Sequence, residues 1–121
     1  MGVDNTVNRT YEYTYSVDPT VGVGGGADLY LDFLQATVMP LVQNLYRIVP
    51  TNPAAPRWGV LGSSLGGLLS CYAGWTRPST YWLAGCMSSS FWWNNEDFNT
   101  TILPTPPASG YVARRRRNVA L

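Results

Sequence analysis

Apolar residues recur with a helical period through the first half of the chain. From residue 31 to residue 45, leucines and valines return every three or four positions, which predicts an amphipathic helix with Asp28 as its N-cap. Pro40 lies inside this pattern and is expected to kink or restart the helix. Three prolines between residues 50 and 56 then predict a loop.

Two short apolar runs follow this loop. Residues 58–61 and residues 81–87 each combine large apolar side chains over a short length, which predicts two buried strands. Residues 65–75, between them, predict a second helix. The order helix, strand, helix, strand is typical of an α/β fold with a mostly parallel sheet and crossover helices.

Neither end of the chain carries such a pattern. Residues 1–26 are polar and aromatic and finish in a glycine cluster, which predicts an extended or looped lead-in. From residue 96 onward the chain is rich in proline and then in arginine, with four consecutive arginines at 114–117. We therefore expect one domain over residues 1–95 and a disordered, solvated tail over residues 96–121.

Composition narrows the class of protein. With 121 residues, 45% hydrophobic and 12% charged, the chain is expected to fold as one globular unit, and its apolar runs are too short to cross a bilayer. Eight basic and seven acidic residues give a net charge of +1, and without the arginine run four basic against seven acidic leave −3. This balance predicts neither a nucleic-acid nor a membrane partner, and the absence of a visible signal peptide makes a cytoplasmic location the default expectation.

Two further patterns bear on cofactor or metal chemistry. Cys71 and Cys86 are the only cysteines, and because their spacing fits no zinc or redox motif they are expected to be buried free thiols. Gly22, Gly24 and Ala27 fit the dinucleotide fingerprint G-x-G-x-x-A. No apolar strand precedes them and no acid follows about 20 residues later, so a flexible loop is favoured and neither metal nor cofactor is expected.

The strongest chemical signal is the G-x-S-x-G pattern at residues 62–66. Only Ser64 has glycine at both the second position before and the second position after it, which makes Ser64 the candidate nucleophile of a nucleophile elbow. Gly62 and Gly66 would leave room for the sharp turn, and the N–H of Leu65 would help to stabilise an oxyanion. The alternative is a glycine-rich helix start with ordinary capping serines. The chain contains no histidine, the usual general base for such a serine.

The segment RWGVLGSSLGGLLSCYAG, followed by YWLAGCMSSSFWWN, resembles a known family. It is similar to the esterase family of α/β-hydrolases that includes enterochelin esterases, S-formylglutathione hydrolase and the mycolyltransferases of the antigen 85 type. GVDN with Arg9 and EYT resembles the family's fourth strand and the turn after it, GGGADLYLDFLQATVMPLVQNLYR resembles the helix before the elbow, and SSSFWWN resembles the end of the sixth strand. The resemblance runs in collinear order from about residue 2 to residue 95.

This resemblance implies a partial α/β-hydrolase fold, three-layered with a truncated, mostly parallel sheet. It implies that residues 1–95 are the central part of the domain, with Ser64 as the nucleophile of a serine esterase and the Leu65 amide as one half of its oxyanion hole. Trp92 and Trp93 match aromatic positions near the substrate cleft, with packing in the core or at the rim as the alternative. Glu96 and Asp97 follow the sixth strand, where this family does not place its acid, and a surface role is expected for both.

The family's acid and histidine follow strands seven and eight, for which this sequence has no counterpart. We therefore expect a segment of a carboxylic ester hydrolase that is inactive alone. Its expected substrate is a small-molecule ester, and its exposed sheet edges are expected to associate with other protein molecules. The alternative is a non-catalytic remnant that acts as a binding or interaction module through its Phe-Trp-Trp cluster and exposed edges.

Overall fold

The computed structural model describes residues 1–4, 6–48 and 58–106. Within it the chain divides into two compact units, Met1–Arg47 and Ile48–Leu121, which are described in turn. The predicted loop at residues 50–56 and the arginine run at 114–117 lie outside the described residues.

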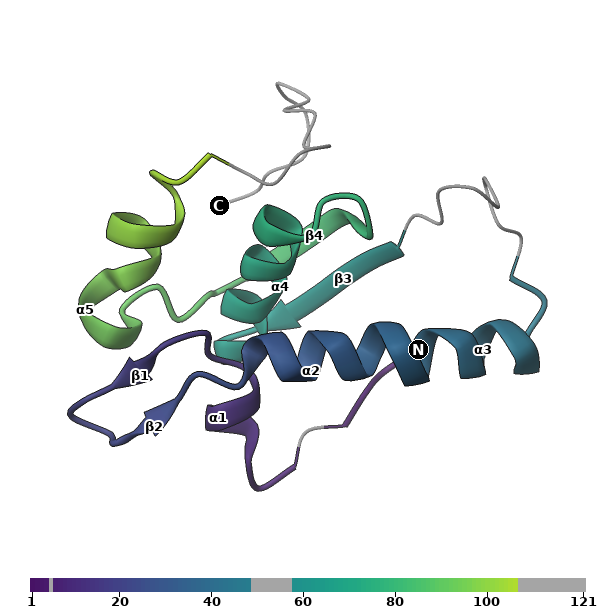
Figure 1. Cartoon of the computed structure of the whole chain (residues 1–121), viewed down its shortest axis with the longest axis horizontal. Coiled ribbons are helices and arrows are strands. Elements are labelled where there is room, and N and C mark those ends of the chain that lie inside the picture. Colours follow the sequence, from purple (N-terminus) through teal and green to yellow (C-terminus); the bar gives the residue numbers. More distant parts are fainter. Residues whose placement is uncertain (5, 49–57, 107–121) are drawn as a thin grey trace. The chain divides into compact units, whose positions relative to one another are not determined.

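A long helix dominates the first unit and runs without a break from residue 27 to residue 45 (Figure 1). It consists of α2 (Ala27–Phe33), a π-helical turn η1 (Leu34–Val38) and α3 (Met39–Leu45). Pro40 is the second residue of α3 and cannot donate a backbone hydrogen bond to the preceding turn, where the helix changes to the wider π form. The helix therefore changes form directly before Pro40 but does not end there.

Two details of the predicted helix are wrong. Its N-cap is Gly26 and not Asp28, because the helix begins at Ala27 and Asp28 lies in its first turn. Its apolar stripe is buried only at Leu31 and Leu34, whereas Leu41 and Leu45 are exposed. The apolar period predicted the position of the helix, but it did not predict which part of the apolar stripe is buried.

The lead-in contains more regular structure than the sequence predicted. A helical turn, α1 (Arg9–Glu12), is followed by a short antiparallel hairpin of β1 (Val17–Asp18) and β2 (Val23–Gly24). Gly22, Gly24 and Gly25 have positive φ, which glycine adopts without steric cost, and they form the end of this hairpin and the chain after it. These glycines therefore do not follow a parallel strand, in agreement with the rejection of the dinucleotide fingerprint.

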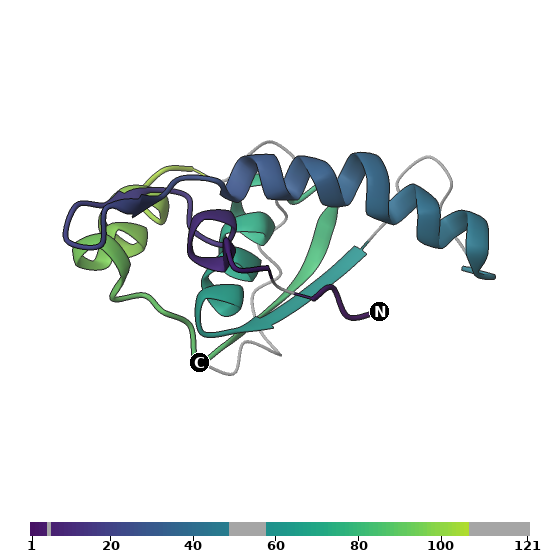
Figure 2. The same cartoon turned by 90° about the horizontal axis from the view of Figure 1, so that it is seen from below.

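The second unit is built on two parallel strands and one helix. β3 (Trp58–Ser63) and β4 (Tyr81–Met87) pair in parallel, with Ser63 opposite Met87, and α4 (Leu65–Thr76) connects β3 to the loop before β4. Figures 1 and 2 show α4 lying against this strand pair. The predicted strand, helix, strand order and its parallel pairing are confirmed, and they form part of an α/β fold.

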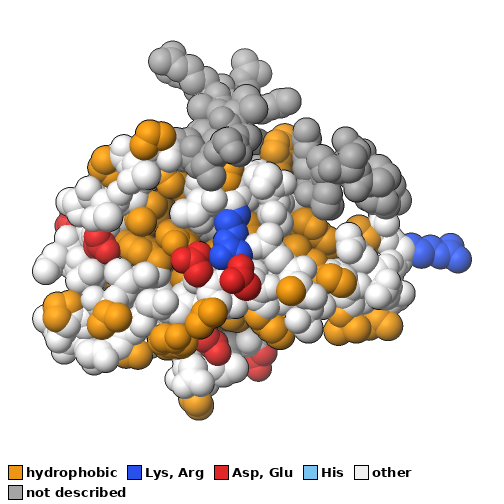
Figure 3. Space-filling view, viewed as in Figure 1, with side chains coloured by type: hydrophobic (Ala, Val, Ile, Leu, Met, Phe, Trp, Pro, Cys, Tyr) orange, Lys and Arg blue, Asp and Glu red, His pale blue; other side chains and the backbone are white. Residues whose placement is uncertain are grey.

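The sequence predicted two buried strands, but in the structure only one face of the strand pair is buried. α4 lies so close to the sheet that a methyl group on Gly74 would come within 2.7 Å of the Ala84 Cβ. On the other face, Leu61 is 69% exposed and Leu83 is 59% exposed. Apolar side chains also appear at many points of the molecular surface drawn in Figure 3. One face of the sheet is therefore packed against α4, and the other face exposes Leu61 and Leu83.

Residues 96–106, which the sequence assigned to a tail, are partly structured. α5 (Trp93–Asp97) contains three consecutive residues with left-handed backbone angles, from Asn94 to Glu96, so it is not a regular helix. A π-helical turn, η2 (Phe98–Ile102), follows, and Phe98 is buried with its ring 5.2 Å from that of Phe91. The indole N–H of Trp75 on α4 donates to the Thr105 carbonyl oxygen at 3.0 Å, which ties this segment to the unit.

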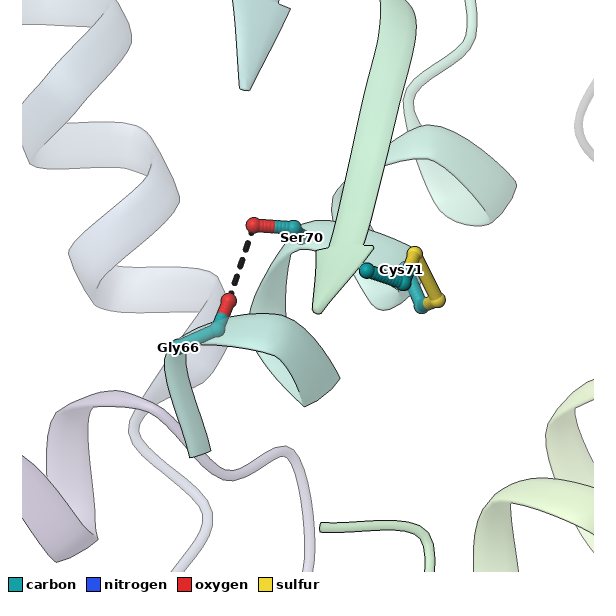
Figure 4. Close-up of a disulfide and its surroundings, with 4 residues drawn as sticks. Gly66, Ser70 and Cys71 are labelled. Carbon is teal, nitrogen blue, oxygen red and sulfur yellow. Dashed lines mark hydrogen bonds between the residues drawn. A yellow bond between two sulfur atoms is a disulfide. The ribbon is translucent and has the colours of Figure 1, made fainter. Parts of the chain in front are cut away.

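Cys71 and Cys86 form a disulfide, so the expectation of buried free thiols is wrong (Figure 4). Cys71 lies on α4 and Cys86 on β4, with their Cα atoms 5.6 Å apart, and both residues are only half-buried. The pairing depends on the packing of α4 against β4, which a spacing of 15 residues in the sequence does not reveal. In the turn before Cys71, the Ser70 hydroxyl donates to the Gly66 carbonyl oxygen at 2.8 Å.

Candidate active site

Ser64 occupies the sharp turn between β3 and α4. β3 ends at Ser63 and α4 begins at Leu65, so Ser64 alone makes the change from strand to helix. Its backbone angles are φ 58° and ψ −123°, a conformation that residues with a side chain rarely adopt. Strained angles of this kind persist only where the surrounding structure holds them, and they are concentrated at functional sites.

Three backbone hydrogen bonds hold Ser64 in this conformation. Its N–H donates to the Met87 carbonyl oxygen at 3.2 Å, at the end of β4. Its carbonyl oxygen accepts from the N–H of Leu68 in the first turn of α4 and from the N–H of Ser90 after β4, both at 3.1 Å. The neighbouring helix and strand therefore both fix the peptide groups on either side of the serine.

The two glycines of the G-x-S-x-G pattern do not play the same part. A Cβ atom on Gly62 would overlap the carbonyl group of Gly66 and lie 2.9 Å from its Cα, whereas a Cβ atom on Gly66 would meet nothing within 4 Å. A Cβ atom on Gly67, the next residue, would lie 2.6 Å from the Ser89 hydroxyl oxygen and 2.7 Å from the Met87 carbonyl oxygen. Space is therefore required at Gly62, as the sequence predicted, and at Gly67. The prediction that Gly66 also provides needed space is wrong.

The side chain of Ser64 is half-buried and contacts a second serine. Its Oγ lies 3.1 Å from the Oγ of Ser90, and either hydroxyl can be the donor. Ser90 is 2% exposed and follows β4 by three residues. Sequence reasoning did not select Ser90, although the run of three serines directly after a predicted parallel strand was a signal, because parallel strands bring their carboxyl ends to one edge of the sheet.

The amide of Leu65 is the first N–H of α4. A helix leaves its first N–H groups without an intrahelical acceptor, and the aligned peptide dipoles make this end partly positive. Leu65 is buried and directly follows Ser64, so its N–H lies at the N-terminal end of α4, one peptide bond after the serine.

The remaining predicted site residues divide between surface and core. Trp92 is 64% exposed, whereas Trp93 is 2% exposed, so Trp93 packs in the interior of the second unit. Glu96 is exposed, and Asp97 accepts a hydrogen bond from the Asn94 side-chain amide at 3.3 Å. Among the described residues, no carboxylate is hydrogen-bonded to Ser64.

Few side chains that could assist Ser64 in catalysis are present in this chain. There is no histidine among its 121 residues. Within residues 1–4, 6–48 and 58–106, no group of three or more His, Cys, Asp or Glu side chains is placed to hold a metal ion. In the same part of the chain, no helix has both the length and the apolar character that a bilayer span requires.

A strand, a serine at positive φ and a helix packed on a parallel strand pair define this unit as part of an α/β-hydrolase fold. The chain belongs to the esterase family described as "Putative esterase", which matches residues 3–113. The match extends beyond Asn95, where the resemblance was expected to end.

Named relatives include two fungal siderophore esterases. The chain is 39% identical over 71 residues to the siderophore triacetylfusarinine C esterase of Aspergillus fumigatus, covering 59% of this chain and 23% of the relative. It is 36% identical over 76 residues to the siderophore enterobactin esterase of Emericella nidulans, covering 63% and 24%. It is 32% identical over 110 residues to the uncharacterized protein YbbA of Bacillus subtilis, covering 87% and 43%.

Solved structures give the same fold. The BES protein of Bacillus cereus superposes with a TM-score of 0.65 at 24% identity, covering 82% of this chain and 36% of that one. The siderophore hydrolase EstB of Aspergillus nidulans superposes with a TM-score of 0.59 at 34% identity, covering 78% and 32%. EstA of the same organism gives 0.60 at 28% identity, covering 81% and 36%. The chain thus spans about a quarter of the length of the fungal relatives it matches.

Proposed function

We propose that Ser64 is the nucleophile of a serine ester hydrolase and that the Leu65 N–H is one of two donors to its oxyanion. The observation that carries this proposal is the positive φ of Ser64 between β3 and α4, where three backbone hydrogen bonds maintain an unfavourable conformation. The membership of the chain in an esterase family supports the same assignment.

The reaction is acyl transfer in two steps. The Ser64 oxygen attacks the carbonyl carbon of an ester, a base takes the serine proton, and the alcohol leaves after receiving that proton. Water then attacks the acylated serine, which releases the carboxylic acid and restores the hydroxyl. The Leu65 N–H stabilises the negative charge that develops on the carbonyl oxygen in both steps.

The base must come from outside this sequence. Because the chain contains no histidine, the Ser64 hydroxyl remains protonated and only weakly nucleophilic in the isolated chain. Loss of one member of a catalytic triad lowers the rate by several orders of magnitude. We therefore propose that these 121 residues alone hydrolyse esters very slowly, and that they become competent when a base from outside them reaches Ser64.

The names of the relatives point to a substrate class. The two fungal relatives are siderophore esterases, and the two matching solved structures from Aspergillus nidulans are siderophore hydrolases. We propose carboxylic esters of siderophores as the substrates of the complete enzyme to which this segment corresponds.

A fluorophosphonate probe tests the assignment of Ser64, with imidazole added as an external base. We expect slow labelling of the unmodified chain and an acceleration of about tenfold or more by imidazole, since a general base accounts for effects of this size or larger. The adduct, located by peptide mass spectrometry, is expected on Ser64. Labelling should disappear in Ser64→Ala and persist in Ser63→Ala, the matched control at the adjacent serine.

Three outcomes would contradict this proposal. Rapid, stoichiometric labelling without imidazole would mean that a base is present within the chain. Labelling that persists in Ser64→Ala would assign the nucleophile elsewhere, and the absence of labelling at high imidazole would remove Ser64 as the nucleophile.

A second candidate function is a non-catalytic interaction module. The observation that favours it is the exposure of Leu61 and Leu83 on the sheet face opposite α4 and of Trp92 after β4. This function predicts a defined complex whose affinity is unchanged in Ser64→Ala and reduced in Trp92→Ala. A chain that stays monodisperse and binds no protein or ligand would contradict it.

A further inference from the structure

We propose that Ser90 is the positioning residue for Ser64: its buried hydroxyl holds the Ser64 side chain in one orientation and stabilises the Ser64 oxygen as it loses its proton. This inference rests on the proposed role of Ser64 as nucleophile and adds a residue that neither the G-x-S-x-G pattern nor the family match assigns.

Ser90 is linked to Ser64 through both backbone and side chain. The N–H of Ser90 donates to the Ser64 carbonyl oxygen at 3.1 Å, and the two Oγ atoms are also 3.1 Å apart. One contact is to the Ser64 carbonyl oxygen and the other to its hydroxyl, so Ser90 constrains the peptide group and the side chain of the strained residue together.

The interior of the unit in turn fixes Ser90. The carbonyl oxygen of Ser90 accepts from the N–H of Trp93 at 3.0 Å, and the Trp93 side chain is buried. On the other side, the Met87 carbonyl oxygen accepts from Ser64, and the chain between Met87 and Ser90 turns at Ser88, whose φ is 41°. The position of the Ser90 hydroxyl is therefore set by a buried tryptophan and by the end of β4, not by a mobile surface loop.

Burial gives the hydroxyl pair a chemical consequence. A buried hydroxyl without a partner loses the hydrogen bonds it had in water, so Ser90 and Ser64 each gain by pairing with the other. While Ser64 keeps its proton, either hydroxyl can donate. Once an external base takes the Ser64 proton, only Ser90 can donate, and its O–H then points at the negative Ser64 oxygen, where a charge-assisted hydrogen bond is stronger. The Ser90 proton stays on Ser90 throughout.

Ser89 provides a matched control in the same segment. Its hydroxyl oxygen is buried, has no hydrogen-bond partner among the described residues, and lies beside Gly67. Ser89→Ala thus removes the same chemical group one residue earlier without altering the contact to Ser64.

The test is the labelling of Ser64 by a fluorophosphonate in the full chain at saturating imidazole, with the probe-binding constant and the maximal labelling rate determined separately. We expect Ser90→Ala to lower the maximal rate about tenfold, the factor that corresponds to the loss of one hydrogen bond in the transition state, with probe binding unchanged. Ser89→Ala should stay within about twofold of the unmodified chain.

A second pair of variants guards against a folding defect. Ser90→Thr and Ser90→Val introduce side chains of nearly the same volume, and only threonine keeps a hydroxyl. We expect threonine to label several times faster than valine even if both are less stable than the unmodified chain, since the comparison isolates the hydroxyl.

The outcomes are distinguishable from failure of the proposed function. If Ser64 labels normally and Ser90→Ala labels at the same rate, the role of Ser90 is overturned while Ser64 remains the nucleophile. Equal losses in Ser90→Ala and Ser89→Ala, or equal rates for threonine and valine, would also overturn it. If the unmodified chain is never labelled at Ser64, the proposed function and this inference fail together.

Discussion

At the scale of single residues, the strained conformation of Ser64 is maintained by contacts on both sides of its peptide. A serine at positive φ costs of order 1–3 kcal/mol. Hydrogen bonds to Met87, Leu68 and Ser90 offset that cost, because each gives a buried backbone group a partner. Gly62 has a different role, because its lack of a side chain lets the first turn of α4 approach the end of β3.

Gly62 and Gly66 should therefore respond differently to the same substitution. Gly62→Ala is expected to destabilise the chain by about 1–3 kcal/mol, because the added methyl group overlaps the Gly66 carbonyl and the backbone must shift. Gly66→Ala is expected to leave stability unchanged or raise it by up to about 1 kcal/mol, because alanine favours a helix and meets nothing there. Urea unfolding of both variants measures the difference, and equal destabilisation would contradict it.

At the scale of elements, α4 and β4 are joined by close packing and by a covalent bond. Gly74 allows the helix to approach Ala84, and the disulfide connects Cys71 to Cys86 on the same two elements. Parallel pairing of β3 with β4 then places the elbow beside the serines that follow β4. The geometry around Ser64 thus depends on the position of α4 relative to the sheet.

Reduction of the disulfide should weaken this arrangement. For a loop of 15 residues, loss of the cross-link is expected to cost about 3 kcal/mol in the free energy of unfolding, through the greater entropy of the unfolded chain. Urea unfolding with and without a reductant measures the effect. A variant carrying both Cys71→Ala and Cys86→Ala is the control, since reductant should not change its stability; an equal effect of reductant on that variant would contradict the explanation.

At the scale of the whole molecule, the β3–β4 sheet exposes apolar side chains on the face opposite α4. Leu61 and Leu83 project from it, and Met87 at the end of β4 is 54% exposed. A parallel sheet is ordinarily covered on both faces, and exposed apolar patches of this kind promote association. The same surface that favours an interaction module would also make the isolated chain self-associate.

Charge placed on this face should reduce self-association. We expect Leu61→Lys combined with Leu83→Lys to shift the chain toward monomer in sedimentation velocity runs at micromolar concentrations, because lysine cannot be buried between copies without losing hydration. Val21→Lys, at another exposed apolar residue in the first unit, is the control and should leave the distribution unchanged. If both changes act alike, net charge and not the sheet face governs association.

The sequence predicted the local elements well and the long-range contacts poorly. The helix after Ser64 and both strands follow from patterns within a few residues, since apolar period and turn chemistry are local properties. The hairpin in the lead-in was missed because β1 and β2 are only two residues long each and carry no detectable alternation.

By itself, the sequence determined that this chain belongs to an esterase family, that it carries a candidate nucleophile at Ser64 and that its 121 residues include no histidine. Only the tertiary structure decided that Ser90 is the partner of that serine, that Cys71 is bonded to Cys86, that Gly62 needs its space and Gly66 does not, and that the sheet exposes Leu61 and Leu83. The physical reason is the same in each case. These contacts join residues that approach one another only when β3, α4 and β4 pack together, and no periodicity along the chain encodes that packing.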